Sequence, residues 1–194
     1  MTKLDRDKTK VVLVTGPSGA GRSSAINVLE DLGFETIDNI PLGYIPHLLD
    51  STDALARPLA LGIDVRNRDF SVERLLELRR TLEAPSRAVD LLYLDCSAEV
   101  LMRRYSETRR RHPLARDESP SDGILREMAL LEDLRGQADI LVDTSELTVH
   151  ELRAEIEGWF GLITGQGMAI SVHSFSYKRG LPQGLDMVFD CRFL

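Results

Sequence analysis

A glycine-rich stretch, GPSGAGRSS at positions 16–24, follows the apolar run VVLV at 11–14 and precedes a segment with helical periodicity. A strand that enters such a turn, followed at once by a helix, binds phosphate, because free N–H groups at the helix N-terminus point at the anion. Gly16, Gly21 and Ser23 match the spacing G-x-x-x-x-G-K-[ST] of a phosphate-binding loop, or P-loop. We therefore predict a P-loop made of Gly16, Pro17, Ser18, Gly19, Ala20, Gly21, Arg22, Ser23 and Ser24.

Arg22 stands where a P-loop ordinarily has lysine. Arginine keeps the positive charge and donates well to phosphate, but its planar group is larger than an ammonium and follows a transferring phosphoryl group less readily. The sequence therefore favours phosphate binding over fast chemistry, with Arg22 at the terminal phosphates and the Ser23 hydroxyl on Mg²⁺. The dinucleotide fingerprint G-x-G-x-x-G is excluded, because Ser18 and Ser24 fall where it requires glycine.

The composition is that of a globular protein. The 194 residues are 43% hydrophobic and 28% charged, with a net charge of -7, which gives no general attraction to nucleic acid or to an acidic membrane surface. Only two cysteines are present, far apart, so a disulfide framework or a zinc site is not expected. The first ten residues are polar and do not resemble a signal peptide, and we expect a cytoplasmic protein.

Apolar runs alternate with amphipathic segments along most of the chain. This β-α alternation predicts an α/β fold, a doubly wound and mostly parallel sheet of the P-loop NTPase or kinase type, at residues 11–162 after a tail at 1–10. Beyond it, strands expected at 168–175 and 185–193 predict the beginning of a second, C-terminal domain at 168–194 that is cut short. The expected strands of the first domain are 11–15, 34–38, 58–65, 89–96 and 140–143, and its expected helices are 22–32, 42–49, 71–82, 98–105, 120–134 and 149–160.

Acidic residues follow three of the expected strands. A P-loop protein needs such a carboxylate to hold Mg²⁺ or its waters, and Asp64, Asp95 and Asp143 are the candidates. We predict that Ser23 and Asp64 hold the metal and that Asp95 acts with Arg22 in catalysis. A helix cap or a turn is the alternative role for each aspartate.

The most basic part of the chain lies at residues 103–116. Its arginines at 103–111 are candidates for a lid that closes over phosphates, as in P-loop kinases. A solvated helix face, a contact to RNA phosphates and a protein-docking surface remain open. His112 has no visible partner in the sequence, so we assign it to the turn that leads into Pro113. In the tail, residues 174–182 mix hydroxyl, basic and aromatic side chains and are typical of a loop.

Several stretches together resemble the RapZ/YvcJ family of bacterial P-loop nucleotide-binding proteins, known as RNase adapter proteins in enteric bacteria. They are GPSGAGRS at 16–23, LEDLGFETIDNIP at 29–41, LGIDVRN at 61–67, RRYSETRRRHPL at 103–114, ILVDTSEL at 140–147, and SFSYKRGLP with DMVFDCRFL at 174–194. The resemblance implies an ATP site at the P-loop and weak ATPase and GTPase activity. It also implies a C-terminal domain that in some members binds small RNAs and an amino-sugar phosphate and so adapts RNA for cleavage by an RNase. It further implies a GTP-binding segment at Asp64, Val65, Arg66 and Asn67.

Three functions remain open at this stage. The first is a regulatory ATP- or GTP-binding protein, at most a slow NTPase, that couples its nucleotide state to an RNA- or metabolite-binding domain. The second is a small-molecule kinase with an arginine-bearing lid and an acceptor near Asp38 and Asn39. The third is an RNA- or protein-binding module with a vestigial nucleotide site. A homo-oligomer is compatible with each of them.

Overall fold

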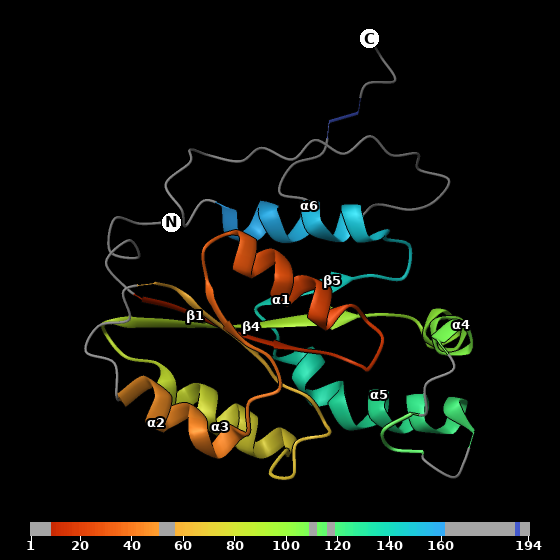
Figure 1. Ribbon diagram of the computed structural model, residues 1–194, viewed down its shortest axis with the longest axis horizontal. Coiled ribbons are helices and arrows are strands. Elements are labelled where there is room, and N and C mark those ends of the chain that lie inside the picture. The colour runs from red at the N-terminus through yellow and green to blue at the C-terminus, as the bar shows by residue number, and fades with distance from the viewer. Residues whose placement is uncertain (1–8, 51–56, 109–111, 116–118, 162–188, 191–194) are drawn as a thin grey trace.

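The computed structural model describes residues 9–50, 57–108, 112–115, 119–161 and 189–190. Five parallel strands form one sheet in the order β2-β3-β1-β4-β5, with helices on both sides (Figure 1). The strands are β1 (Thr9–Thr15), β2 (Glu35–Ile37), β3 (Leu59–Gly62), β4 (Arg87–Asp95) and β5 (Ile140–Asp143). The helices are α1 (Arg22–Asp31), α2 (Ile45–Asp50), α3 (Val72–Leu82), α4 (Ala98–Thr108), α5 (Pro120–Gly136) and α6 (Val149–Phe160), with a 3-10 turn, η2 (Leu42–Tyr44), before α2.

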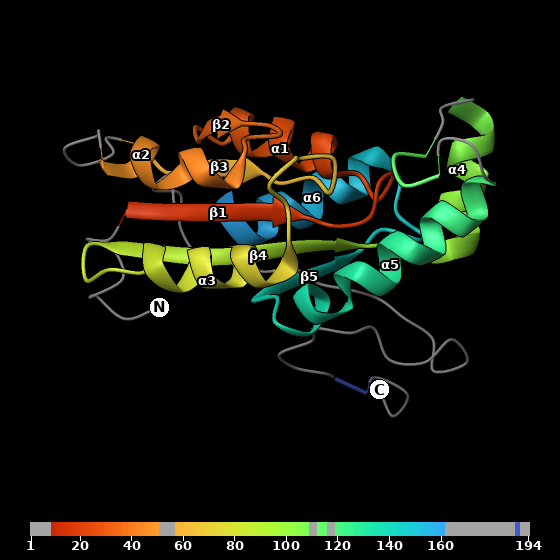
Figure 2. The same ribbon diagram turned by 90° about the horizontal axis from the view of Figure 1, so that it is seen from below.

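The central strand is apolar on both of its faces. Val11 to Val14 are fully buried, because helices cover the sheet on each side, as is usual for parallel sheets. Figure 1 shows α1 and α6 above the sheet and α2 and α3 below it, and Figure 2, which views the sheet nearly face-on from below, shows α4 beyond the ends toward which the strands point. One apolar cluster packs α1 and α6 on the sheet, and the other packs α2, α3 and the C-terminal half of α5 against the opposite face.

Local signals account for where several helices begin. Ser71 precedes α3 and its side chain accepts a hydrogen bond from the Arg74 N–H. Ser119 caps α5 in the same manner, and proline is the first residue of that helix. The Thr148 and Glu151 side chains form a reciprocal capping box at the start of α6. α1 differs, because its N-cap is Gly21 and no side chain caps it.

The predicted α/β class and parallel sheet are confirmed, and the observed elements differ from the expected ones mainly at their ends. β3 ends at Gly62, so Asp64 lies in the loop after the strand rather than within it. The strands expected at 168–175 and 185–193 fall on residues 162–188 and 191–194, outside the described part of the chain, apart from 189–190, which form no regular element. No helix among the described residues is long and apolar enough to cross a membrane.

Candidate phosphate-binding site

The glycines of the P-loop are required by its backbone. Gly16 has a φ of 143°, and a Cβ placed on it would lie 2.2 Å from the carbonyl oxygen of Leu94 in β4. Gly21 has a φ of 102° and turns the chain into α1. Both values lie in the region that favours glycine, so the spacing that identified the motif is also the spacing that the fold needs.

Helix α1 begins at the end of this loop with backbone amides that have no acceptor within the helix. Its first internal hydrogen bond runs from the Ala25 N–H to the Gly21 carbonyl, at 3.0 Å. The N–H groups of Arg22, Ser23 and Ser24 precede that bond and therefore have no acceptor within the helix. The Ser23 side chain is exposed at the same helix end. Unpaired amides at a helix N-terminus, where the helix dipole is positive, form a site for an anion such as phosphate.

The loop also sits where an open α/β sheet takes its ligands. It follows the carboxyl end of β1, whose neighbours are β3 and β4. The chain leaves β1 toward the β2 edge and later crosses to β4 on the other side, so β1 is the strand at which the winding reverses. Ligands bind at this reversal, outside the carboxyl ends of the strands.

Arg22 is directed into the protein rather than into the loop. It is 8% exposed, and its guanidinium donates to the Asp64 carboxylate at 2.5 Å and to the Ile63 carbonyl at 3.3 Å. Its Nε lies 3.4 Å from an Asp38 carboxylate oxygen but makes no hydrogen bond within the described part of the chain. Arg22 therefore ties α1 to the loop after β3, and the predicted contact with terminal phosphates requires that these bonds rearrange.

Asp64 is a buried carboxylate shared by two arginines. Burial alone would raise its pKa, but hydrogen bonds from Arg66 and the charge of Arg22 outweigh burial and hold the pKa below its usual range. Arg66 donates to it from its backbone N–H at 2.9 Å and from Nε at 2.7 Å, and a third bond comes from its terminal nitrogen. Because both carboxylate oxygens are occupied, the predicted role of Asp64 as a metal ligand requires that these bonds rearrange.

The rest of the 64–67 segment is mostly scaffold. Asn67 donates to the Ile40 carbonyl at 2.8 Å, and Val65 packs against the apolar cluster under α3. Arg66 is the exception, because 55% of its side chain is exposed. Among these four residues, Arg66 therefore offers a charged group to a ligand.

Asp38, which the sequence suggested only as a neighbour of a kinase acceptor, lies beside the Ser23 hydroxyl. Its carboxylate is 38% exposed, and Ser23 Oγ donates to it at 3.4 Å. Hydroxyl and carboxylate oxygens are suitable ligands for Mg²⁺, which keeps several waters and binds one or two protein oxygens. No group of three or more histidine, cysteine or acidic side chains is arranged for a metal within the described ranges. The arrangement therefore fits Mg²⁺ bound together with a phosphate, and not a site built from protein ligands alone.

The other two candidate aspartates are engaged elsewhere. Asp95, at the end of β4, receives a 2.8 Å bond from Arg135 of α5 and a 3.0 Å bond from the Cys96 N–H. Asp143 caps the turn after β5 by accepting bonds from the backbone and hydroxyl of Ser145. The bonds of Asp143 match the turn role that was left open for it, whereas Asp95 forms an ion pair with Arg135 that was not among the alternatives.

Thr144 and Arg104 bind backbone carbonyls of the P-loop. Neither contact was predicted from the sequence motifs. Thr144 is buried, and its hydroxyl donates to the Ala20 carbonyl at 2.9 Å. Arg104 of α4 donates to the Gly19 carbonyl at 2.9 Å and to the Thr144 carbonyl at 2.7 Å. Arg104 belongs to the basic stretch, so one arginine of this stretch contacts the P-loop. It binds the Gly19 carbonyl of the loop, whereas the lid predicted from the sequence would bind phosphate. Residues 109–111 of the expected lid lie outside the described chain.

His112 begins the expected turn into Pro113, since the Ala115 N–H donates to its carbonyl at 3.1 Å. Its side chain, for which the sequence showed no partner, is completely buried and has one. Its Nε2 lies 2.8 Å from a carboxylate oxygen of Glu127 in α5. Glu127 in turn accepts bonds from the N–H and the hydroxyl of Ser18. Glu127 was not among the candidates, since a single glutamate in an amphipathic helix carries no sequence signal of such a contact.

Residues 9–162 match the family model described as the RapZ-like N-terminal domain. The chain belongs to the RapZ-like family. A relative in Ruegeria pomeroyi, named a nucleotide-binding protein, is 62% identical over 182 residues, which is 93% of this chain and 64% of the relative. A nucleotide-binding protein of Dinoroseobacter shibae is 61% identical over 95% of this chain and 62% of its own length. The chain thus spans somewhat less than two thirds of these RapZ-like relatives.

Solved structures of small kinases share the fold. Shikimate kinase from Acinetobacter baumannii is 20% identical, with a TM-score of 0.53 over 84% of this chain and 99% of its own. Shikimate kinase from Bacteroides thetaiotaomicron is 15% identical, with a TM-score of 0.54 over 78% of this chain and 98% of its own. At these identities the likeness establishes a P-loop kinase fold for the RapZ-like chain and nothing about its substrate.

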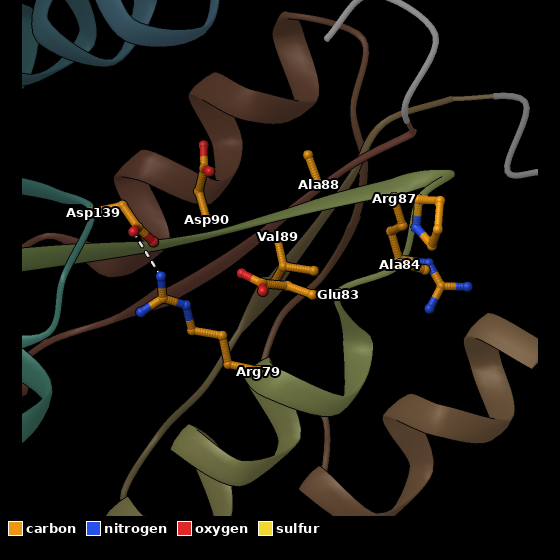
Figure 3. A pocket seen from close by; sticks show the side chains of 9 residues that line it. Arg79, Glu83, Ala84, Arg87, Ala88, Val89, Asp90 and Asp139 are labelled. Carbon is orange, nitrogen blue, oxygen red and sulfur yellow. Dashed lines mark hydrogen bonds and ion pairs between the residues drawn. The ribbon is translucent and has the colours of Figure 1, made fainter. Parts of the chain in front are cut away.

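A shallow hollow on the RapZ-like domain lies at the amino ends of the strands, at the opposite end of the sheet from the P-loop. Figure 3 shows it between the end of α3 and the beginning of β4. Its charges are partly paired, since Arg79 donates to Asp139 at 2.6 Å and to the Gln137 carbonyl at 2.8 Å. The amino ends of parallel strands are not where such sheets bind ligands, so we do not assign the site to this hollow. It is lined by Arg79, Glu83, Ala84, Pro85, Arg87, Ala88, Val89, Asp90 and Asp139.

Proposed function

We propose that this RapZ-like chain binds a nucleoside triphosphate, ATP or GTP, at residues 16–24. The observation that carries the proposal is the start of α1, where the amides of Arg22, Ser23 and Ser24 precede the first helical hydrogen bond at the end of a glycine loop. A polyphosphate satisfies several such amides at once. The names of the Ruegeria and Dinoroseobacter relatives support a nucleotide as the ligand.

Mg²⁺ would be held by the phosphates together with the exposed Ser23 hydroxyl. Asp38, 3.4 Å from that hydroxyl, would accept hydrogen bonds from the waters of the ion. Bound in this way, the ion would neutralise phosphate charge. Asp38 thus takes the outer position for which Asp64 and Asp95 were the sequence candidates, since both of those carboxylates are paired with arginines.

Turnover of the bound nucleotide would be slow. In P-loop enzymes a flexible lysine at this position follows the charge of the transferring group. Here Arg22 is held by Asp64 and by the Ile63 carbonyl under the loop. Its positive charge is therefore neutralised by Asp64 and does not reach a terminal phosphate. The site would bind nucleotide more readily than it would hydrolyse it.

Replacement of Arg22 by lysine is expected to raise the hydrolysis rate about tenfold or more while changing the dissociation constant by less than about threefold. A lysine lacks the rigid guanidinium fork that bonds Asp64 and the Ile63 carbonyl from two separate nitrogens, and its ammonium on a flexible stem is freer to reach phosphate. Titration calorimetry with ATP and with GTP, with and without Mg²⁺, gives the affinities, and phosphate release gives the rate. Arg68→Lys, at an exposed arginine, is the matched control.

The two parts of the proposal fail separately in this experiment. If the native chain binds neither nucleotide at millimolar concentration, nucleotide binding itself is refuted. If the native chain binds nucleotide but Arg22→Lys hydrolyses it no faster, binding stands and the role given to Arg22 is wrong.

A second proposal concerns the whole protein. We propose that nucleotide binding here sets the state of C-terminal segments that bind small RNA or an amino-sugar phosphate, and through them an RNase, in the cytoplasm. The proposal rests on the resemblance of residues 174–194 and on the greater length of the relatives. Arg66, with more than half of its side chain exposed, is the residue of the 64–67 segment through which a guanine nucleotide would be contacted.

A further inference from the structure

The P-loop is tied to α5 by one buried carboxylate. Only 2% of the Glu127 side chain is exposed, although it carries an ionisable group. One of its oxygens accepts the Ser18 N–H at 3.0 Å, and the other accepts the Ser18 hydroxyl at 2.9 Å. Ser18 and Glu127 are 109 residues apart in the sequence, so this contact joins the loop after β1 to a helix near the end of the domain.

His112 holds this carboxylate in place from the other side. Its Nδ1 accepts the Leu114 N–H at 3.2 Å, so the proton of the neutral ring lies on Nε2, which donates to Glu127 at 2.8 Å. The ring also lies against Tyr105, with 5.1 Å between the ring centroids. α5 packs so closely here that a Cβ on Gly123 would lie 2.4 Å from His112 Nδ1. This packing leaves the His112 ring little room to move, and its bond holds the carboxylate beside Ser18.

We propose that Glu127 is a positioning residue for the phosphate-binding loop, acting through Ser18 and held in place by His112. This inference rests on the proposed nucleotide binding. Ser18 lies between Gly16 and Gly19, which both have positive φ and no side chain with which to anchor the loop. Two hydrogen bonds to one residue at this point restrict the loop to the conformation in which the amides of α1 are presented together.

The proposal requires hydrogen bonds at Glu127, not its charge. Burial raises the pKa of the Glu127 carboxyl, while the bonds from Ser18 and His112 oppose the rise. A glutamine has the same shape, and its oxygen can accept from the Ser18 N–H and His112 while its amide donates to the Ser18 hydroxyl, which can turn to accept. Positioning should therefore survive the loss of the charge and should be lost with the side chain.

Three variants measured by titration calorimetry with Mg-ATP test this. Glu127→Gln should bind within about threefold of the native chain, and Glu127→Ala about tenfold more weakly, as expected for lost hydrogen bonds to a charged group. Glu132→Ala, on the same helix at a glutamate whose side chain is 70% exposed, should change nothing. Ser18→Ala combined with Glu127→Ala should bind no more weakly than Glu127→Ala alone, because the two residues act as one unit.

Amide hydrogen exchange of the free protein gives a readout that needs no nucleotide. The Ser18 amide should exchange at least about tenfold faster in Glu127→Ala than in the native chain and near the native rate in Glu127→Gln. Folded Glu127→Ala with native affinity, or additive effects in the double variant, would overturn the proposal. If the native chain binds no nucleotide while exchange changes as described, the nucleotide function fails and the link from Glu127 to the loop stands. If Glu127→Ala does not fold, poor binding by Glu127→Gln overturns the proposal on its own.

Discussion

Gly16→Ala is expected to lower the free energy of unfolding by about 4 kcal/mol, as the sum of backbone strain and overpacking. The φ of 143° at this position is unfavourable for alanine, and the new Cβ would lie 2.2 Å from the Leu94 carbonyl oxygen. That oxygen belongs to a central strand and cannot move aside as a flexible side chain would. Urea denaturation followed by circular dichroism measures the change.

Gly33→Ala separates the two contributions. Gly33 also has a positive φ, 89°, but a Cβ there would meet nothing within 4 Å. Only the backbone strain remains, and the expected loss is about 1 kcal/mol. Equal losses for the two variants would show that the P-loop does not pack on β4 as described.

Asp64→Asn is expected to destabilise the protein by about 3 kcal/mol, because it removes one partner of a buried ion pair and leaves the other uncompensated. Only 1% of the Asp64 side chain is exposed, and Arg22, also buried, would lose its carboxylate. Asparagine keeps the shape of the side chain, so packing does not confuse the comparison. Asp133→Asn, at an exposed aspartate of α5, is the control and should change stability by less than about 0.5 kcal/mol.

The same variant has a predicted pH dependence. The folded-state pKa of Asp64 lies below its unfolded value, so its contribution is complete above the unfolded pKa of about 4 and is lost as the pH falls through the folded pKa. The difference between native and Asp64→Asn protein should be constant from pH 7 to 5 and should shrink below pH 4. A difference that is the same at pH 7 and pH 3 would mean that Asp64 is not the ionised partner of Arg22.

The P-loop backbone, the central strand and the helix caps could be predicted, because each depends on the types of residues close together in the sequence. The chain adopts positive φ at Gly16 and Gly21, and the apolar run at 11–14 is a strand buried on both faces. A serine before α3 and a threonine before α6 form the caps that their residue types favour. Each of these features depends on residues only a few positions apart in the chain, so the sequence alone is enough to predict it.

Side-chain partners were harder to predict, because they depend on which strands become neighbours. Arg22 was assigned to phosphate from its place in the motif, and only the pairing of β1 with β3 brings it to Asp64, 42 residues later. The carboxylate partner of His112 lies in another segment, and Glu127 reaches it only when α5 packs against the turn. Residue types limit which pairs can form, and tertiary packing selects among them.

We propose above that the loop after β1 holds a nucleoside triphosphate through the amides at the start of α1. Proton–nitrogen correlation spectra recorded while Mg-ATP is added test it most directly, because each amide reports its own environment. The signals of Arg22, Ser23 and Ser24 should move and saturate together, while those of Arg87 and Asp90, at the amino end of β4, should not move. Saturable binding that leaves the amides of Arg22, Ser23 and Ser24 unmoved would contradict it.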